Sequence, residues 1–552
     1  MGIVSRKGRG GFTRRAVVKT GIGAASALAM PALLRATVRT AFAADARATI
    51  KVAPETDLKI FDPVWTTATI TSTHSWLVYD TLFALDRGYK ASPQMVEKYE
   101  ASDDGLTHNF KLRDGLGFHD GTPVTARDCV ASIRRWAARL GKAKIMLDRA
   151  EKLDVVDDKS FVLKLKEPFG PVVDTLANAS QVCFIMREKE ASTDPYEQVK
   201  EVVGSGPFIW NKEEWQPGNL VTYRKNPNYK PRSEPANGYA GGKVVHVERV
   251  EWHVIPDPAV QSAALTTGEL DYLTNPVADQ VKEMRGKPNI MVGFLDPLGW
   301  QFHIRMNSLN KPFNNAKARQ AVQMLVESRQ EAYLTATGQT GDLGKVCLAP
   351  FVCGSPNETM IGTDGFKKYD PEKIKALFKE AGYAGEPIVI MDPTDQQNLH
   401  FLALVLNGHL KELGINTDLQ SMDWQTLVTR RAIKKPPSED RGGWNIFPTA
   451  WPSSTMMDPV LNAPLDSSCD GKNWFGWPCD DGMQKLRLDY LAARDADQRK
   501  ATVEAIQKRF FEEAPYAYAG QYLQPMAYRS DRLKGLVGLV SPVYWNVEKM
   551  AG

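Results

Sequence analysis

The segment 109–136, NFKLRDGLGFHDGTPVTARDCVASIRRW, constrains the fold of this 552-residue chain more than any other. Phe110 and Leu112 alternate with charged residues, which predicts a half-buried strand. An Asp-Gly turn, a second apolar stretch and a second Asp-Gly turn follow. Thr125 lies three residues before Asp128, the spacing of a capping box that opens a helix. The segment therefore predicts a unit of strand, turn, strand, turn and capped helix.

The charge of the chain is unevenly distributed. Residues 1–43 contain eight Lys and Arg and no acid, and the remainder holds 61 Lys and Arg against 65 Asp and Glu. A mildly acidic mature chain gives no reason to expect a nucleic-acid partner. The length exceeds what one hydrophobic core serves, so at least two domains are expected.

The N-terminus has the features of an export signal. Arg14 and Arg15 precede an apolar run at 21–34 that is too short and too rich in Gly and Ala to span a bilayer. We predict a twin-arginine signal at residues 1–43, cleaved near Ala43, with the twin-arginine machinery as a partner. A basic disordered tail is the alternative. The first Cys is Cys129, so no lipid-attachment motif precedes it, and we expect a free protein in the periplasm.

The six Cys residues suit an oxidising compartment. We predict disulfides that close two short loops, Cys347–Cys353 and Cys469–Cys479, although six Cys allow fifteen pairings and the spacing does not choose among them. Neither pair has the Cys-x-x-Cys spacing of zinc sites. The two remaining residues, Cys129 and Cys183, are interpreted as small buried side chains.

Several further elements are predicted from local patterns. They are a strand at 49–53, a helix with Trp76, Tyr79, Leu82 and Phe83 on one face, a hairpin of 153–156 with 161–165, a helix from Asp257-Pro258 to Gly268, a helix at 401–413, two charged amphipathic segments in 494–514, and a strand at 516–522.

The segment 109–136 resembles the signature block of the extracytoplasmic solute-binding proteins of ABC importers, family 5, the dipeptide, oligopeptide and nickel class. The matching residues are Phe110, Leu112, Arg113, Gly115, Phe118, His119, Asp120, Gly121, Pro123, Thr125, Ala126 and Asp128. Further blocks, such as Gly204-Ser205-Gly206-Pro207-Phe208, extend the resemblance from about residue 53 to 536. In the family the signature block is scaffold, so we expect His119 and Asp120 to be structural.

The resemblance implies an α/β protein with the two-lobed periplasmic binding protein fold, type II-like and of cluster C, with an extra subdomain inserted in the first lobe. We expect the first lobe at 44–88, 204–295 and 526–552, the inserted subdomain at 89–203, and the second lobe at 296–525. A monomer would close on its ligand in a hinge motion and deliver it to an ABC permease in the inner membrane. No catalytic residue, cofactor or metal is implied.

The chain departs from the peptide-binding members at their ligand anchors. Ser454, in Ala450-Trp451-Pro452-Ser453-Ser454, stands where those members place the Asp that pairs with a peptide's α-ammonium, and Ala84-Leu85 stands where they often have Glu-Gly. A buried ammonium needs a carboxylate, so we expect simple dipeptides to bind weakly. Asp423 or Asp458 is an alternative anchor.

Aromatic residues on predicted loops indicate the pocket. The family places the loop 61–67 at the cleft edge, and Trp residues are dense near the departing segment, including Trp474 and Trp477. The predicted ligand-binding residues are Trp65, Thr66, Trp424, Trp444, Trp451 and Ser454.

Two other classes of function compete with a solute receptor of peptides or other small organic solutes. One is an enzyme exported by the twin-arginine route, and the other is capture of nickel or a metal chelate. The sequence has no nucleophile elbow and no His-Glu-x-x-His, and its eight His residues lack metal-ligand spacing. A solute receptor is therefore the preferred hypothesis.

Overall fold

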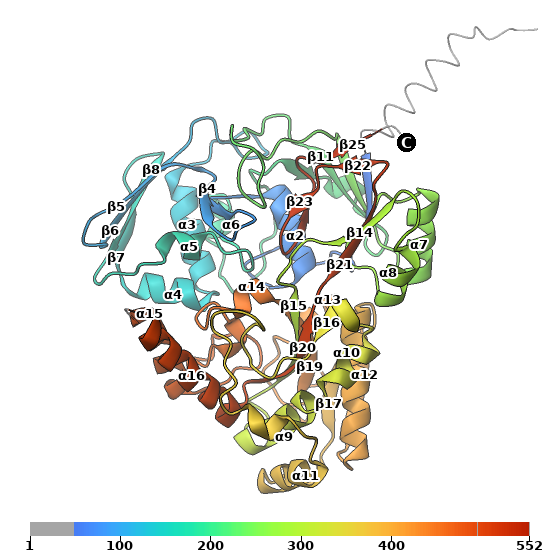
Figure 1. The fold of residues 1–552 in the computed structure, drawn as a ribbon. Coiled ribbons are helices and arrows are strands. Elements are labelled where there is room, and N and C mark those ends of the chain that lie inside the picture. Colours follow the sequence, from blue (N-terminus) through green and yellow to red (C-terminus); the bar gives the residue numbers. More distant parts are fainter. Residues whose placement is uncertain (1–48, 494, 551–552) are drawn as a thin grey trace, which may run out of the picture. The chain divides into compact units, whose positions relative to one another are not determined.

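The computed structural model describes residues 49–493 and 495–550. The predicted export signal and its cleavage site lie outside these residues. The described residues fall within one compact unit built on two large sheets, which Figure 1 shows one above the other. We call the half with the seven-stranded sheet the first lobe and the half with the six-stranded sheet the second lobe.

The first lobe is organised around the central strand β1, which runs parallel to both neighbours and buries Ile50 and Val52 completely. Its sheet order is β10 (Phe208–Trp210), β11 (Leu220–Lys225), β12 (Arg249–His253), β1 (Thr49–Ala53), β13 (Tyr272–Leu273), β21 (Pro525–Arg529) and β14 (Ile290–Phe294). Its helices are α2 (Thr69–Val78), α7 (Pro258–Thr267) and α8 (Ala278–Met284). Helix α7 begins at Asp257 and ends at Gly268, as predicted.

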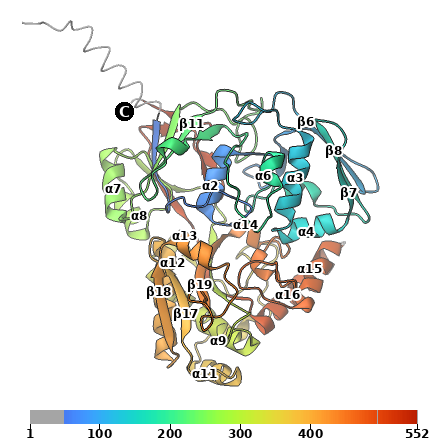
Figure 2. The same ribbon diagram turned by 180° about the vertical axis from the view of Figure 1, so that it is seen from behind.

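A four-stranded antiparallel sheet lies beside the seven-stranded one in both views (Figures 1 and 2). It comprises β5 (Val96–Ala101), β6 (Thr107–Leu112), β8 (Ser160–Leu165) and β7 (Ala150–Val155), in that order. The helices α3 (Ala126–Ala137), α4 (Gly141–Asp148), α5 (Val172–Leu176) and α6 (Glu188–Ala191) accompany it. These elements fall within 89–203, and their independence as an inserted subdomain stays a prediction.

The second lobe is organised around β15, whose seven residues are all buried. The sheet order is β16 (Gly344–Lys345), β20 (Tyr516–Tyr522), β15 (Trp300–Met306), β19 (Ile446–Pro452), β17 (Ile388–Pro393) and β18 (Thr417–Met422). The helices are α9 (Ala316–Glu327), α10 (Gln330–Ala336), α11 (Pro371–Glu380), α12 (Gln397–Glu412), α13 (Trp424–Arg430), α14 (Ser453–Met456), α15 (Asp481–Ala492) and α16 (Ala496–Glu513).

Short pairs and single turns complete the described fold. The pairs are β2 (Asp80–Thr81) with β9 (Phe184–Ile185), β3 (Phe83–Leu85) with β4 (Ala91–Pro93), β22 (Leu533–Lys534) with β25 (Glu548–Lys549), and β23 (Val537–Gly538) with β24 (Pro542–Val543). The 3-10 turns are η1 (Lys212–Glu214), η2 (Gly341–Leu343), η3 (Thr363–Phe366) and η4 (Ala463–Leu465).

Two neighbouring segments connect the lobes. Strand β14 pairs with β21 in the first sheet and β15 pairs with β20 in the second, so the chain crosses at 295–299 and 523–524. Gly299 has φ +67°, and a Cβ there would lie 2.2 Å from the Tyr522 carbonyl oxygen. Glycine therefore permits the two crossing segments to run close together.

Three predicted elements differ from the structure. Helix α2 ends at Val78, because the Val78 carbonyl accepts from the Gly206 N–H and Gly206 packs against the helix end, where a Cβ would lie 2.6 Å from a backbone oxygen. The apolar residues Tyr79, Leu82 and Phe83 are buried outside the helix. The second strand of the signature unit is a single bridge between Gly117 and Pro123.

The third difference is in 494–514, where one helix, α16, replaces the two predicted segments.

The remaining local predictions are confirmed, except that helix α12 begins at Gln397, four residues before the predicted start at 401. The Asp128 carboxylate accepts from the Thr125 N–H at 2.8 Å, as in a capping box, and also from the Thr125 hydroxyl at 2.7 Å. Asp120 accepts from the Thr122 N–H, and the His119 Nε2 lies 3.1 Å from the Gly206 carbonyl oxygen, so both are scaffold. The structure contains the two expected disulfides, Cys347–Cys353 and Cys469–Cys479, and the free residues Cys129 and Cys183 are buried.

Candidate functional site

A buried ion pair fixes the loop 62–67 in front of helix α2. The Asp62 carboxylate accepts from two nitrogens of Arg135, at 2.7 and 3.1 Å, and both side chains are 1 % exposed. The carboxylate also accepts from the Val64 and Val199 N–H groups, at 2.9 Å each. Because these donors occupy its oxygens, Asp62 anchors the loop and offers no free charge to a ligand.

Arg431 reaches this loop from the second lobe. It ends helix α13, is 1 % exposed, and donates from Nη2 to the hydroxyl oxygens of Thr66 and Thr67, at 3.2 and 3.3 Å. Its guanidinium carbon lies 4.5 Å from the ring centre of Phe475. Burial, with a smaller effect from the positive charge of Arg139, lowers the pKa of Arg431 to about 9.

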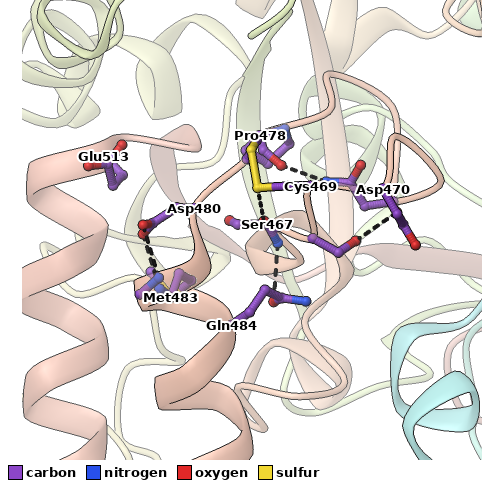
Figure 3. The surroundings of a disulfide bond; sticks show 12 residues. Ser467, Cys469, Asp470, Pro478, Asp480, Met483, Gln484 and Glu513 are labelled. Atoms are coloured by element: carbon purple, nitrogen blue, oxygen red, sulfur yellow. Dashed lines mark hydrogen bonds between the residues drawn. A yellow bond between two sulfur atoms is a disulfide. The ribbon is translucent and has the colours of Figure 1, made fainter. Parts of the chain in front are cut away.

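The second-lobe loop between Cys469 and Cys479 presents aromatic side chains to the same place. Figure 3 shows the disulfide at its base, next to the cap of helix α15, where Asp480 accepts from the Met483 N–H. The Trp474 indole N–H donates to the Thr67 hydroxyl oxygen at 3.3 Å. The disulfide and this hydrogen bond together hold an aromatic wall against the first lobe.

One cavity between the lobes, which we call the aromatic chamber, has a volume of about 220 Å³. Both lobes contribute to its lining. The principal side chains are Trp65, Thr66, Thr67, Trp136, Arg139, Tyr196, Lys434, Lys472, Trp474, Phe475 and Trp477. Among the described residues no acid lines it, and the guanidinium carbon of Arg139 lies 4.6 Å from the ring centre of Tyr196. The chamber is thus aromatic and positively charged.

Two smaller chambers adjoin. The arginine chamber, about 40 Å³, shares Pro63, Thr66, Thr67 and Gln181 with the aromatic chamber and is also lined by Arg431. Trp300, Trp424 and Trp451 line it too.

The third, the glutamate chamber, is about 60 Å³ and is lined by Glu55, Asn275, Trp300, Gln396 and Trp424 among others. Glu55 accepts from the Thr274 hydroxyl, and burial raises the pKa of Glu55 to about 7. The two smaller chambers therefore differ in character, because one is lined by a buried arginine and the other by a carboxyl that burial favours in its neutral form.

Ion pairs join the lobes around the chambers. They are Lys59–Asp423 at 2.8 Å, Lys142–Asp458 at 3.0 Å and Lys144–Asp470 at 3.1 Å. Together with the Arg431 contacts, they describe a closed arrangement of the two lobes. These contacts and the chambers that they surround lie between the two lobes.

The structure brings four of the six predicted site residues to the chambers. Trp65 and Thr66 line the aromatic chamber, and Trp424 and Trp451 line the arginine chamber. Trp444 is fully buried, with its indole N–H on the Ile433 carbonyl and its ring 6.0 Å from that of Trp477. It lies behind the wall and lines neither chamber.

Ser454, the sixth predicted residue, also lines neither the aromatic nor the arginine chamber. Its hydroxyl has no hydrogen-bond partner among the described residues. The two acids considered as replacement anchors have other roles, because Asp423 binds Lys59 and caps α13, and Asp458 binds Lys142. Neither acid lines these two chambers.

The sequence interpretation missed the two arginines, Arg139 and Arg431, and the aromatic residues Tyr196 and Phe475. Arg431 meets Thr66 across 365 positions in the chain. No local pattern distinguishes it from the neighbouring Arg430, which binds the carbonyls of Gly442 and Gly443. Trp474 and Trp477 could have been predicted as chamber residues from the high local density of Trp in the sequence.

Within 49–493 and 495–550, every helix is too short or too polar to span a bilayer. In the same residues, no three His, Cys, Asp or Glu side chains are grouped as ligands for a metal ion.

Proteins similar in sequence along most of this chain include two that are named as binding proteins. A probable peptide ABC transporter periplasmic-binding protein, y4tO, of Sinorhizobium fredii is 43% identical over 541 residues, which cover 98% of this chain and 99% of that protein. The glutathione-binding protein GsiB of Escherichia coli is 26% identical over 451 residues, covering 80% of this chain and 81% of GsiB.

Solved structures share the fold at low sequence identity. The periplasmic binding protein AgaA of A. tumefaciens, in complex with agropinic acid, has a TM-score of 0.75 at 20% identity and covers 91% of this chain and 99% of AgaA. DppA of Helicobacter pylori, in complex with the peptide STSA, has a TM-score of 0.74 at 20% identity, with coverages of 91% and 98%. The expected α/β, two-lobed periplasmic binding protein fold is thereby confirmed.

Residues 90–473 match the family described as bacterial extracellular solute-binding proteins, family 5. The matched range includes the signature block at 109–136. With this match and the full-length relative, the chain belongs to the family 5 extracellular solute-binding proteins.

Proposed function

We propose that this protein is the periplasmic receptor of an ABC importer, and that it captures a small organic solute in the aromatic chamber. The observation that carries the proposal is the enclosure of this chamber by side chains from both lobes, with Trp65 and Thr66 on one side and Trp474, Phe475 and Trp477 on the other. A site that both lobes complete couples ligand capture to closure.

The size of the chamber favours a small cargo. A volume of about 220 Å³ is below the roughly 300–1,000 Å³ of pockets for drug-sized ligands. The relatives' names include peptide, glutathione and agropinic acid ligands. Since Ser454 replaces the peptide-anchoring Asp, the preferred cargo is a non-peptide solute, and simple dipeptides bind weakly.

The predicted site residues take different parts in this proposal. Trp65 and Thr66 contact the cargo in the aromatic chamber, and Trp424 and Trp451 contact the part of it that reaches the adjoining arginine chamber. Trp444 supports Trp477 from behind, and Ser454 leaves its part of the cleft uncharged. The protein acts as a binding protein rather than a catalyst, and needs no cofactor.

The wider setting follows from the same proposal. Residues 1–43 direct export by the twin-arginine machinery, the mature monomer starts near Ala44, and a permease in the inner membrane receives the cargo. Replacing Arg14 and Arg15 with Lys tests the export route, since an unchanged yield of periplasmic protein would contradict it.

One experiment tests capture by closure. Protein purified from the periplasm is divided, its bound small molecules are released by denaturation and identified by mass spectrometry, and the identified compound is returned to ligand-free protein during small-angle scattering. We expect a released organic solute and a smaller radius of gyration on its addition. Identical scattering profiles with and without saturating solute would contradict a closing cleft.

A further inference from the structure

Arg431 is a buried cation without an anionic partner. Its acceptors among the described residues are the hydroxyl oxygens of Thr66 and Thr67, both at 3.2–3.3 Å, and its Nε has no acceptor. An unpaired charge removed from water is costly, and proteins pair such charges or bond them fully. This guanidinium lines the arginine chamber, which both lobes enclose.

The same chain provides partners for its other buried cations. Lys243 pairs with Asp80 at 2.8 Å with both side chains fully buried, and Arg135 pairs with Asp62. Arg305 has no carboxylate, but it donates four hydrogen bonds to backbone carbonyls. Arg431 therefore differs from these three, because its contacts among the described residues are two hydroxyl oxygens and aromatic rings, with neither a carboxylate nor a set of carbonyls.

The surroundings of Arg431 present further hydrogen-bond donors. The Thr66 hydroxyl oxygen accepts from the Ala68 N–H and from Arg431, and the Thr67 hydroxyl oxygen accepts from Trp474 and Arg431. With their oxygens occupied as acceptors, the two hydroxyls have their protons to donate. Arg139 adds a second guanidinium in the adjoining chamber, and within the part of the chain that the structure describes no acid lines either chamber.

We propose that the cargo is a small organic anion whose carboxylate enters the arginine chamber and binds Arg431, Thr66 and Thr67. This inference rests on the proposed function and narrows it to one charge class. A volume of about 40 Å³ exceeds the roughly 10–15 Å³ that one water needs and suits a carboxylate group. A carboxylate would accept from the guanidinium and both hydroxyls and supply the missing negative charge.

The aromatic chamber receives the rest of the same molecule. Trp65, Trp474, Phe475 and Trp477 form its walls, and it shares Thr66 and Thr67 with the arginine chamber. A carboxylate on a short arm places an apolar or aromatic body among these rings. Lys434 and Lys472 at the same lining reinforce selection for negative charge.

The test uses probes matched in shape and different in charge. Indole-3-acetate and 3-phenylpropionate are compared by titration calorimetry with their primary amides and with phenethylamine, a cation, on the full mature protein. We expect each carboxylate to bind about 10–100-fold more tightly than its amide, the factor that a hydrogen bond to a charged group provides. The charge of any solute released from the native protein is determined in parallel.

Two variants separate the site from its surroundings. Arg431→Gln is expected to abolish the preference for carboxylate over amide, and Thr66→Val to reduce it. The matched control is Arg430→Gln at the adjacent position, because Arg430 bonds backbone carbonyls and lines none of the chambers described above. The control should keep the preference of the unmodified protein.

The outcomes distinguish this inference from the proposed function. Amides or the amine binding as tightly as the carboxylates, or a neutral or cationic native solute, would overturn the anion assignment and leave a solute receptor in place. A carboxylate preference that survives Arg431→Gln would also overturn it. If no probe of any charge binds and no solute is released, the proposed function itself fails, and the anion assignment fails with it.

Discussion

Two buried arginines in the second lobe, Arg305 and Arg431, differ in the hydrogen-bond acceptors that surround their guanidinium groups. Both guanidiniums are essentially inaccessible, and burial lowers the pKa of each to about 9. Arg305 donates to the carbonyls of Phe475, Pro464, Pro515 and Trp474, at 2.6–3.3 Å. Arg431 has two hydroxyl oxygens and aromatic faces.

The difference separates a structural role from a recognition role. Arg305 ties the loop carrying Trp474 and Phe475 to strand β15, so its donors are used within the protein. Arg431 faces an enclosed chamber with its donors incompletely used. Since the desolvation of the two is similar, the missing compensation at Arg431 is what a ligand would restore.

The largest expected effect comes from removing the satisfied arginine. Arg305→Gln leaves several buried carbonyls without donors, and we expect a loss of about 3–5 kcal/mol in the free energy of unfolding. Arg431→Gln removes an uncompensated charge, so the ligand-free protein should keep its stability or gain about 1 kcal/mol. Urea unfolding of both variants measures the contrast, and equal losses would remove the distinction between the two sites.

Structural features whose determinants are close together in the sequence were predicted better than those that depend on distant residues. The Thr125–Asp128 cap and the Asp257–Gly268 helix were predictable because their determinants lie within a few residues. The end of helix α2 was not, since it depends on contact with Gly206, more than a hundred positions away. Sequence motifs thus defined the scaffold more reliably than its ends.

The site residues divide in the same way. Trp65 and Thr66 were predicted because the family places their loop at the cleft edge, and Trp424 and Trp451 from the density of Trp, and all four line the chambers. Trp444 shares that density but is packed in the core behind them. Arg431 could not be predicted as a site residue, because what distinguishes it is a buried guanidinium without a carboxylate partner. This property can be seen only in the folded chain.

The next largest effect concerns the loop that Arg305 supports. The Cys469–Cys479 disulfide closes this loop at its base, and reduction should cost about 2–3 kcal/mol in stability. The aromatic wall would also lose its fixed position, so the affinity for the native solute should fall. The test compares the double variant Cys469→Ser/Cys479→Ser with the double variant Cys347→Ser/Cys353→Ser. Titration calorimetry measures the affinity of each for the native solute. Equal affinity of the two double variants would contradict a specific role for the Cys469–Cys479 loop.

The smallest effect concerns Glu55, an incompletely bonded buried acid that mirrors Arg431. Its Oε1 has no partner among the described residues, and burial raises its pKa from 4.5 to about 7. Below pH 4.5 the carboxyl is neutral in both the folded and unfolded chain. Between pH 4.5 and 7 the unfolded chain ionises while the folded chain stays neutral, so stability falls as the pH rises through this window.

We expect this contribution to lower the free energy of unfolding by about 1–2 kcal/mol from pH 5 to pH 8, discounted for the part of Glu55 that faces its chamber. Glu55→Gln keeps the shape and removes the titration, so it should be more stable than the unmodified protein at pH 8 and equal to it at pH 5. Thermal unfolding at both pH values measures this. Glu97→Gln, which changes an acid on an exposed ion pair, is the control and should show no such crossover. If Glu55→Gln and the unmodified protein showed the same pH dependence of stability, the Glu55 carboxylate would be sufficiently hydrogen-bonded in the folded state. Of the two residues compared, Arg431 alone would then remain incompletely bonded.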